Sequence, residues 1–204
     1  MKKIKINLKE VKQDEVDLIV GYLKKGKIIV YPTDTIYGLG CDATNGQAIN
    51  KIYKIKKRSK KFPLLILVGS FCMLRKYCYL NKKQSEFIKN LRNNSQEPTS
   101  VILKSRGVLP KELTGGPDSI AVRLPADLPK NDFLIKIVRG VKKPIVSTSL
   151  NLSGKKNLEE VGGVEKYFKG LRPDLVIDAG RIKRVKPSRV VDIREMKEVR
   201  VVRR

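Results

Sequence analysis

Hydrophobic positions along the chain alternate between a helical spacing and short continuous runs. Residues 14–25 place four apolar side chains at i, i+3, i+4 and i+7, with acids in the first turn and Gly26 directly beyond, which predicts a helix with its stop signal. The run KIIVYP at 27–32 ends at a proline and is continuously apolar, as expected for a buried strand. The same order of helix and buried strand recurs at 47–58 and 63–68.

The rest of the chain continues this alternation. Helical spacing is found at 70–78, 82–92, 131–138 and, weakly, 158–168. Strand-like runs occupy 100–104, 119–125, 143–149, 175–181 and 188–193. The pair of strands between 100 and 124 indicates some antiparallel neighbours. We therefore predict an α/β fold: one domain over residues 1–204, with a twisted sheet of mixed parallel and antiparallel strands flanked by helices.

Composition excludes several kinds of chemistry. The 204 residues contain no histidine, which excludes a Ser/His/Asp triad, a Cys/His dyad and histidine-based zinc sites. The three cysteines, Cys41, Cys72 and Cys78, have no CxxC spacing and are expected to be reduced and mostly buried. No apolar segment typical of a leader or of a membrane span is found, so we expect a cytoplasmic protein with no membrane contact.

The formal net charge is +25, from 45 Lys and Arg against 20 Asp and Glu. Such an excess indicates a polyanionic partner, either RNA or a phosphate-rich ligand. The cations are spread over the whole chain, however, so a Lys- and Ile-rich compositional bias explains the charge equally well. Both explanations stay open at this point.

The basic charge is densest from Lys54 to Lys61, where six of eight residues are cations. In a helix that ends near Arg58, Lys54 and Arg58 stand at i and i+4, while Lys56 lies on another side. We expect Lys56 and Arg58 to flank the following turn and to hold neighbouring phosphates. The competing interpretation, which the run alone favours, is a solvated helix end stabilised by the helix dipole.

Two further stretches place polar side chains after strands. In YPTDTIYGLGCDA, residues 31–43, a strand ending at Pro32 is expected to deliver Thr33, Asp34 and Thr35 to a loop, where two hydroxyls and a carboxylate would suit a small zwitterion. Gly38 and Gly40 would let the backbone turn or approach a ligand closely, and an ordinary turn is the alternative. In STSLNLSG, residues 147–154, neutral donors and acceptors could bind phosphate or an adenine edge. The alternative there is a capped turn into the next helix, with Ser153 or Asn157 as its N-cap.

Taken in order, these stretches resemble the YrdC family, the threonylcarbamoyl-AMP synthases of tRNA threonylcarbamoyladenosine biosynthesis. YPTDTIYGLGCDA is similar to the family's P-T-E/D-T-x-Y-G-L-G segment and SIAVRLP to its V-R-x-P strand. Lys56-Lys57-Arg58 matches its K-x-R element, Ser149-Leu150-Asn151 its S-x-N element, and Lys186-Pro187-Ser188 with VVD its P-S-x-x-x-D segment. The resemblance covers about residues 12–203 and implies a YrdC-like fold with a central ligand cavity.

The chain departs from the family's pattern at several positions. Lys57 stands where glycine is common, Ser59 where proline is common and Phe62 where a polar residue is common. Leu67 occupies a position where some members place a threonine-contacting histidine. The segment NNSQEPTSVIL, residues 93–103, replaces a W-P-G-P-x-T-x-x-L segment and keeps only its proline and one hydroxyl. The chain looks like the short, single-domain form of the family.

The resemblance implies the condensation of L-threonine, bicarbonate and ATP into threonylcarbamoyl-AMP and pyrophosphate, a nucleotidyltransferase reaction. The substrates supply both nucleophiles, so a chain without histidine can catalyse it. It also implies a Mg²⁺ ion held mainly by ATP. A downstream threonylcarbamoyl transferase complex is the expected partner, and tRNA is a further candidate.

The site residues implied by the resemblance come from all of the matched motifs. They are Lys56 and Arg58 on ATP phosphates and bicarbonate oxygens, Ser149 and Asn151 on the nucleotide or adenylate, Thr35 and Ser147 on the polar groups of threonine, Arg123 on its carboxylate, Ser119 and Ser188 in the cavity wall, and Arg203 over ATP.

Two other readings use the same residues differently. The first is a YrdC-like RNA-binding protein without adenylation activity, which the +25 charge and the altered segment 93–103 favour. The second is the carbamoyl-adenylate domain of hydrogenase maturation proteins, which normally lies among zinc-binding and acylphosphatase-like modules. The sequence shows no such modules.

Overall fold

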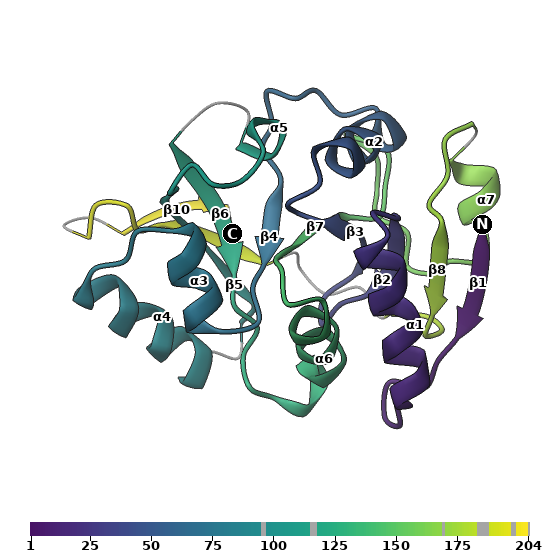
Figure 1. The fold of residues 1–204 in the computed structure, drawn as a ribbon, viewed down its shortest axis with the longest axis horizontal. Helices are drawn as coiled ribbons and strands as arrows, with labels where there is room; N and C mark the ends of the chain where they lie inside the picture. Colours follow the sequence, from purple (N-terminus) through teal and green to yellow (C-terminus); the bar gives the residue numbers. More distant parts are fainter. Residues whose placement is uncertain (95–96, 115–117, 169, 183–187, 197–198, 204) are drawn as a thin grey trace.

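The computed structural model describes residues 1–94, 97–114, 118–168, 170–182, 188–196 and 199–203. Ten strands of this described chain form one continuous sheet (Figure 1). In the order in which they lie across the sheet, the strands are β1 (Lys2–Lys5), β8 (Leu175–Asp178), β2 (Ile29–Pro32), β3 (Tyr37–Asp42), β7 (Ile145–Ser149), β4 (Leu65–Leu67), β6 (Ser119–Arg123), β5 (Thr99–Lys104), β9 (Arg189–Asp192) and β10 (Arg200–Arg203).

The helices of the described chain cover this sheet. They are α1 (Gln13–Lys24), α2 (Gly46–Lys56), α3 (Phe71–Tyr77), α4 (Lys82–Asn94), α5 (Lys111–Thr114), the 3₁₀ turn η1 (Pro129–Asn131), α6 (Asp132–Val141) and α7 (Val164–Tyr167). The predicted helices are confirmed, except that only the last part of 158–168 is helical, as α7. The N-cap of α7 is Gly163, so the expectation of a cap at Ser153 or Asn157 is wrong.

The sheet is mixed, as predicted. β2 pairs in parallel with β8 and antiparallel with β3, and β4 pairs antiparallel with β7 and in parallel with β6. β5 and β6, the two strands between residues 99 and 123, are antiparallel. The crossings in strand order place β7, a late strand, between β3 and β4, so the polar end of β7 lies at the centre of the sheet.

Both faces of the central strands are buried. Ile29 and Tyr31 of β2 pack in one apolar cluster with α1 and α6, whereas Val30 packs in a second cluster with α2, α3 and α4. Because consecutive residues of a strand point to opposite faces, a strand covered on both sides must be apolar at every position. This explains the continuous apolar runs in the sequence.

Two strands at the edges of the sheet were not predicted. β1 pairs with β8, and β10 pairs with β9 through a register shift between Val201 and Arg203. Their sequences, KKIK and RVVR, expose most side chains and so lack the apolar signal of the central strands. Tertiary pairing alone makes these segments extended.

The three cysteines are free, and two of them are buried, as expected. Cys41 and Cys78 are buried, Cys72 is exposed, and none of the three forms a disulfide in the described chain. In the same residues, no helix has the length and apolarity needed to cross a membrane.

The predicted strand end at Pro32 is confirmed, but the prediction that the loop after it extends through Gly38 and Gly40 is wrong. Residues 37–42 form β3, a fully buried strand. A Cβ atom on Gly40 would lie 2.7 Å from the ring of Tyr31 and 2.9 Å from the carbonyl oxygen of Val146. The close backbone approach at Gly40 therefore serves the packing of β2, β3 and β7, whereas the sequence indicates either a turn or a close approach to a ligand at this glycine.

This packing generates a stability prediction. Gly40→Ala should lower the free energy of unfolding by about 2 kcal/mol, because the new methyl group meets the backbone of β7, which cannot move cheaply. Urea unfolding followed by circular dichroism measures the change. Gly162→Ala is the matched control, since a Cβ there has no atom within 4 Å; equal effects of the two variants would contradict the packing argument.

Candidate active site

A cavity of about 370 Å³ lies over the central strands. Its walls come from the β2–β3 turn, the segment after α2, and parts of β4, β6, β7, β9 and β10. Its polar lining residues are Thr33, Thr35, Arg58, Arg123, Ser147, Thr148, Ser149, Asn157, Ser188 and Arg203. The described lining contains three arginines and no carboxylate, so the cavity favours anionic ligands.

The K-x-R segment lies at the C-terminal end of α2, and its two outer cations, Lys56 and Arg58, lie in different surroundings. α2 ends at Lys56, and Lys57 adopts a left-handed conformation with φ 49° and ψ 41°. The N–H groups of Lys57 and Arg58 donate to the carbonyls of Lys54 and Tyr53, at 3.1 and 3.0 Å, which is the hydrogen-bond pattern of a Schellman motif. Arg58 is thus beyond the helix, and the expected i, i+4 relation with Lys54 is wrong.

Lys56 points into the protein and not into the cavity. Its side chain is 1% exposed, and its ammonium donates to the carbonyl of Ser149, to the carbonyl of Asn151 at 2.8 Å and to Oδ1 of Asn151 at 2.9 Å. The hydroxyl of Ser149 donates to the same Oδ1 at 2.6 Å. The Lys56 ammonium therefore fixes the conformation of the S-x-N segment from its buried side.

The charge of Lys56 is held without a neighbouring acid, since no described carboxylate forms an ion pair with it. Burial, with a smaller effect from the charge of Arg58, lowers the pKa of Lys56 to about 7. Three oxygen acceptors support the protonated form in this place.

Two other cations, Arg58 and Arg203, line the cavity. Arg58 is oriented by hydrogen bonds from Nε to the carbonyl of Phe62 and from Nη2 to that of Pro63, at 3.1 and 3.3 Å. Arg203 of β10 donates from Nη2 and Nε to the carbonyl of Ser188, at 2.7 and 3.1 Å. Burial, followed by the charge of Arg58, lowers the pKa of Arg203. The positive charges of Arg58 and Arg203 therefore repel each other, and an anion bound close to both would relieve this repulsion.

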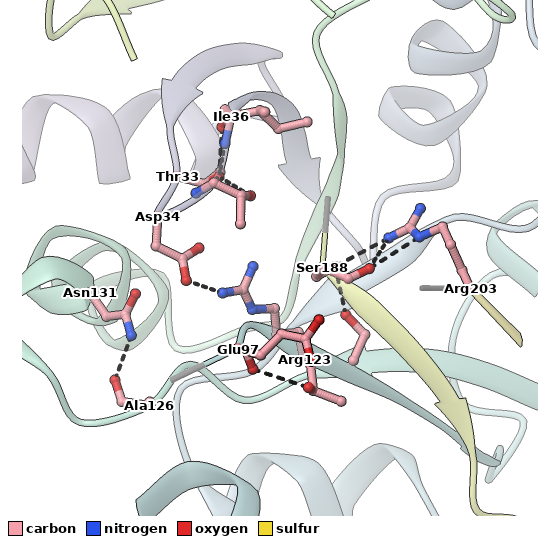
Figure 2. A network of polar contacts seen from close by, with 12 residues as sticks. Thr33, Asp34, Ile36, Glu97, Arg123, Ala126, Asn131, Ser188 and Arg203 are labelled. Carbon is pink, nitrogen blue, oxygen red and sulfur yellow. Dashed lines mark hydrogen bonds and ion pairs between the residues drawn. The ribbon is translucent and has the colours of Figure 1, made fainter. Parts of the chain in front are cut away.

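The turn between β2 and β3 presents Thr35 to the cavity. The hydroxyl of Thr33 donates to the carbonyl of Ile36 at 2.6 Å and accepts from the N–H groups of Thr35 and Ile36, at 3.2 and 3.1 Å. This side chain closes the turn on itself, as Figure 2 shows. Thr35 is 4% exposed and lies 3.1 Å from Thr33, hydroxyl to hydroxyl.

Arg123, at the end of β6, forms a buried ion pair with Asp34 from the same turn (Figure 2). The side chains are 8% and 2% exposed, respectively. The pair joins the β2–β3 turn to β6, although β7 and β4 lie between them in the sheet. The family resemblance implies that Arg123 pairs with a ligand carboxylate, and the ion pair with Asp34 was not predicted.

Serine hydroxyls complete the wall. Ser147 of β7 accepts a hydrogen bond from the hydroxyl of Tyr31 at 2.8 Å, and burial raises the pKa of that tyrosine, which keeps it a donor. Ser188 lies 3.3 Å from the buried hydroxyl of Ser100 and 3.2 Å from Nη2 of Arg203. Ser100 is the hydroxyl retained in the altered segment 93–103.

The structure brings together most of the residues that the sequence singled out. Those that line the cavity are Thr35, Arg58, Arg123, Ser147, Ser149, Ser188 and Arg203. Lys56 and Asn151 lie behind it, and Ser119 starts β6 opposite Lys104, away from the cavity. Asn157 lines the cavity but carried no ligand signal in the sequence. Lys186 and Pro187 fall outside the described residues.

Residues 21–204 match the Sua5/YciO/YrdC family model, which carries the description "Telomere recombination". The chain belongs to the Sua5/YciO/YrdC family. A threonylcarbamoyl-AMP synthase of Pyrococcus abyssi is 29% identical over 93% of this chain, and a putative one of Methanocaldococcus jannaschii is 32% identical over 96%. The chain spans 54% of the first relative's length and 90% of the second's.

Solved structures of the Sua5/YciO/YrdC family superpose on the chain. P. abyssi Sua5 complexed with L-threonine gives a TM-score of 0.79 at 28% identity, covering 94% of this chain and 53% of that one. E. coli YciO gives a TM-score of 0.81 at 24% identity, covering 99% and 93%, and this likeness concerns the fold alone. The family resemblance predicted from the sequence is therefore confirmed, together with its fold.

The buried ammonium generates a prediction about pH. Because the pKa of Lys56 in the folded protein lies below that in the unfolded chain, the unfolded chain binds more protons between about pH 7 and 10, and stability from this group rises with pH there. The free energy of unfolding of the wild type, minus that of Lys56→Met, should increase by about 1 kcal/mol per pH unit from pH 7.5 to 9. Urea unfolding at each pH measures it. Lys54→Met, an exposed control on α2, should give no slope; parallel curves for wild type and Lys56→Met would refute the prediction.

The left-handed backbone of Lys57 generates a prediction about stability. Lys57→Gly should raise the free energy of unfolding by about 0.5–1 kcal/mol, because glycine adopts a positive φ without a Cβ penalty. Lys57→Ala removes the same charge but keeps the Cβ, so it should give no such gain. Thermal unfolding of the three proteins separates the two effects, and equal stabilisation by both variants would point to charge alone.

Proposed function

We propose that this protein is a threonylcarbamoyl-AMP synthase, an enzyme that condenses L-threonine, bicarbonate and ATP into threonylcarbamoyl-AMP and pyrophosphate. The observation that carries the proposal is a cavity in which three arginines and several hydroxyls converge with no carboxylate in the described lining. Support also comes from the relatives named threonylcarbamoyl-AMP synthase and from the threonine complex of P. abyssi Sua5.

The reaction requires the protein to supply positive charge and to position the substrates. The amine of threonine attacks the carbon of bicarbonate, water leaves, and an oxygen of the resulting carbamate attacks the α-phosphorus of ATP with departure of pyrophosphate. Each nucleophile belongs to a substrate, so catalysis consists of holding several anions in contact in a preorganised positive field. This makes the protein a nucleotidyltransferase that needs no histidine.

Arg58 and Arg203 are assigned to the phosphates of ATP and the oxygens derived from bicarbonate. Their guanidinium groups are fixed by backbone carbonyls, and the described ion pairs leave them without a carboxylate. Ser149 is assigned to the nucleotide or the adenylate. Lys56 and Asn151 act on the same ligand indirectly, by holding the loop that carries Ser149.

L-Threonine is assigned to the part of the cavity near the β2–β3 turn. Thr35 and Ser147 would contact its amine and hydroxyl, and Arg123 its carboxylate. Leu67, Leu65 and Ile36 line the same cavity and offer an apolar surface for the methyl group. Leu67 cannot replace the hydrogen bond of the histidine that some family members place there.

A Mg²⁺ ion is expected to enter with ATP. The described residues contain no group of three or more acidic, cysteine or histidine side chains that could bind a metal ion, so phosphate oxygens and water would hold it. Its role would be to neutralise the departing pyrophosphate. A threonylcarbamoyl transferase complex would receive the product, and direct contact with tRNA stays a prediction from charge.

The test is pyrophosphate release from ATP with bicarbonate and Mg²⁺, comparing L-threonine, L-serine and no amino acid. Threonine-dependent release supports the synthase; its absence in a sample that binds RNA would favour the RNA-binding alternative.

Arg58→Ala should reduce this threonine-dependent release at least tenfold, about 1.4 kcal/mol in the barrier, because it removes a fixed positive charge from the cavity. Lys54→Ala removes an equal charge from the exposed face of α2 and should stay within twofold of the wild type. Unchanged release in Arg58→Ala would overturn the assignment of this arginine.

A further inference from the structure

The Asp34–Arg123 ion pair connects two parts of the sheet that share no hydrogen bonds. Asp34 belongs to the turn after β2, and Arg123 ends β6. The two residues are separated by 89 positions in sequence and by two strands in the sheet. Because both side chains are buried, the pair is held in a place where bulk solvent cannot loosen it.

The carboxylate lies on the side of Arg123 that faces away from the main cavity. Arg123 lines both that cavity and a second, smaller chamber of about 30 Å³, whereas Asp34 lines only the chamber. The ion pair engages Nη2, one of the three nitrogens that carry the five N–H groups of a guanidinium. A ligand in the cavity can therefore approach Arg123 without displacing Asp34.

Oδ1 of Asp34 is buried with no hydrogen-bond partner among the described residues, and so are Oδ1 of Asn131 and Nε of Arg92, which line the same chamber. In Figure 2 the side chain of Asn131 lies beside Asp34 and donates to the carbonyl of Ala126, at 2.8 Å. A chamber of about 30 Å³ has room for a water molecule, the usual partner of buried polar atoms that the protein leaves without one.

We propose that Asp34 is a positioning residue for substrate binding: it holds the Arg123 guanidinium from behind, so that its remaining N–H groups face the carboxylate of the amino-acid substrate. The inference rests on the proposed function for the identity of that substrate. Without Asp34, Arg123 would keep its charge but lose its fixed orientation. Binding of the substrate would then have to order the Arg123 side chain, and the lost conformational entropy would weaken the affinity.

The turn is built to keep Asp34 in this place. Hydrogen bonds of the Thr33 side chain lock the backbone on both sides of Asp34, and Thr35 extends from the same turn into the cavity. One short segment thus supplies a direct contact for the substrate and, through Asp34, the orientation of the opposing arginine.

The opposite role for Asp34 makes a different prediction. If its carboxylate occupied the substrate's place on Arg123, then removing it would free the arginine and tighten binding. The placement of Asp34 outside the main cavity argues against competition, and the affinity for the amino acid decides between the two roles.

The experiment compares Asp34→Ala and Asp34→Asn with the wild type, by steady-state pyrophosphate release and by calorimetric titration with L-threonine. Asp34→Ala should raise the KM for L-threonine about tenfold while the KM for ATP stays within twofold. Asp34→Asn keeps an oxygen that accepts from Nη2 and should recover most of the loss. Asp127→Asn is the matched control, because Asp127 pairs at the surface with Arg92, another arginine of the chamber, and should change neither KM.

Several outcomes would overturn the proposal. A lower or unchanged KM for L-threonine in Asp34→Ala would make Asp34 a competitor or a bystander. Equal losses for both substrates in both variants, with a lower melting temperature, would make it structural only. If the wild type releases no pyrophosphate, the synthase assignment fails, but calorimetry still decides on Asp34: weaker L-threonine binding in Asp34→Ala supports its role, and no binding by the wild type refutes it.

Discussion

A buried ammonium at the end of α2 determines the geometry of the site. Lys56 donates to two carbonyls and one amide oxygen at the end of β7 and in the loop after it, and no carboxylate of the described residues forms an ion pair with it. A buried charge is tolerated only when it is fully hydrogen-bonded, so the loop must stay in the conformation that satisfies Nζ. The position of Ser149 in the cavity follows from that constraint.

The same helix end also places Arg58 in the wall of the cavity, whereas Lys56 is buried in the protein. The left-handed backbone at Lys57 reverses the chain in one residue, so that two cations separated by a single position lie in different surroundings, Lys56 in the core and Arg58 in the cavity wall. With Arg203 and Arg123, this gives a cavity lined by three arginines, and the carboxylate of Asp34, which pairs with Arg123, is not among its lining residues. The arrangement combines attraction for several anions with a fixed direction for each donor.

The strand order of the sheet brings together the few segments that build this site. Strand β7 lies between β3 and β4, so its polar end meets the β2–β3 turn on one side and the segment after α2 on the other. β6 and the edge strands add Arg123, Ser188 and Arg203. A positive cavity of this kind over the ends of central strands is consistent with the placement of ligand sites in open α/β sheets.

The sequence by itself determined the buried elements and the kinds of residues in the site. Continuous apolar runs identified β2 and β4 because strands covered on both faces have few polar positions, a shorter apolar run identified the start of β7, and ordered motifs identified the family. Only the tertiary structure decided that residues 37–42 are a strand, that Lys56 turns inward while Arg58 turns to the cavity, and that Asp34 pairs with Arg123. These outcomes depend on one residue's backbone angle and on strand order, which bring together groups distant in sequence, and local periodicity carries neither.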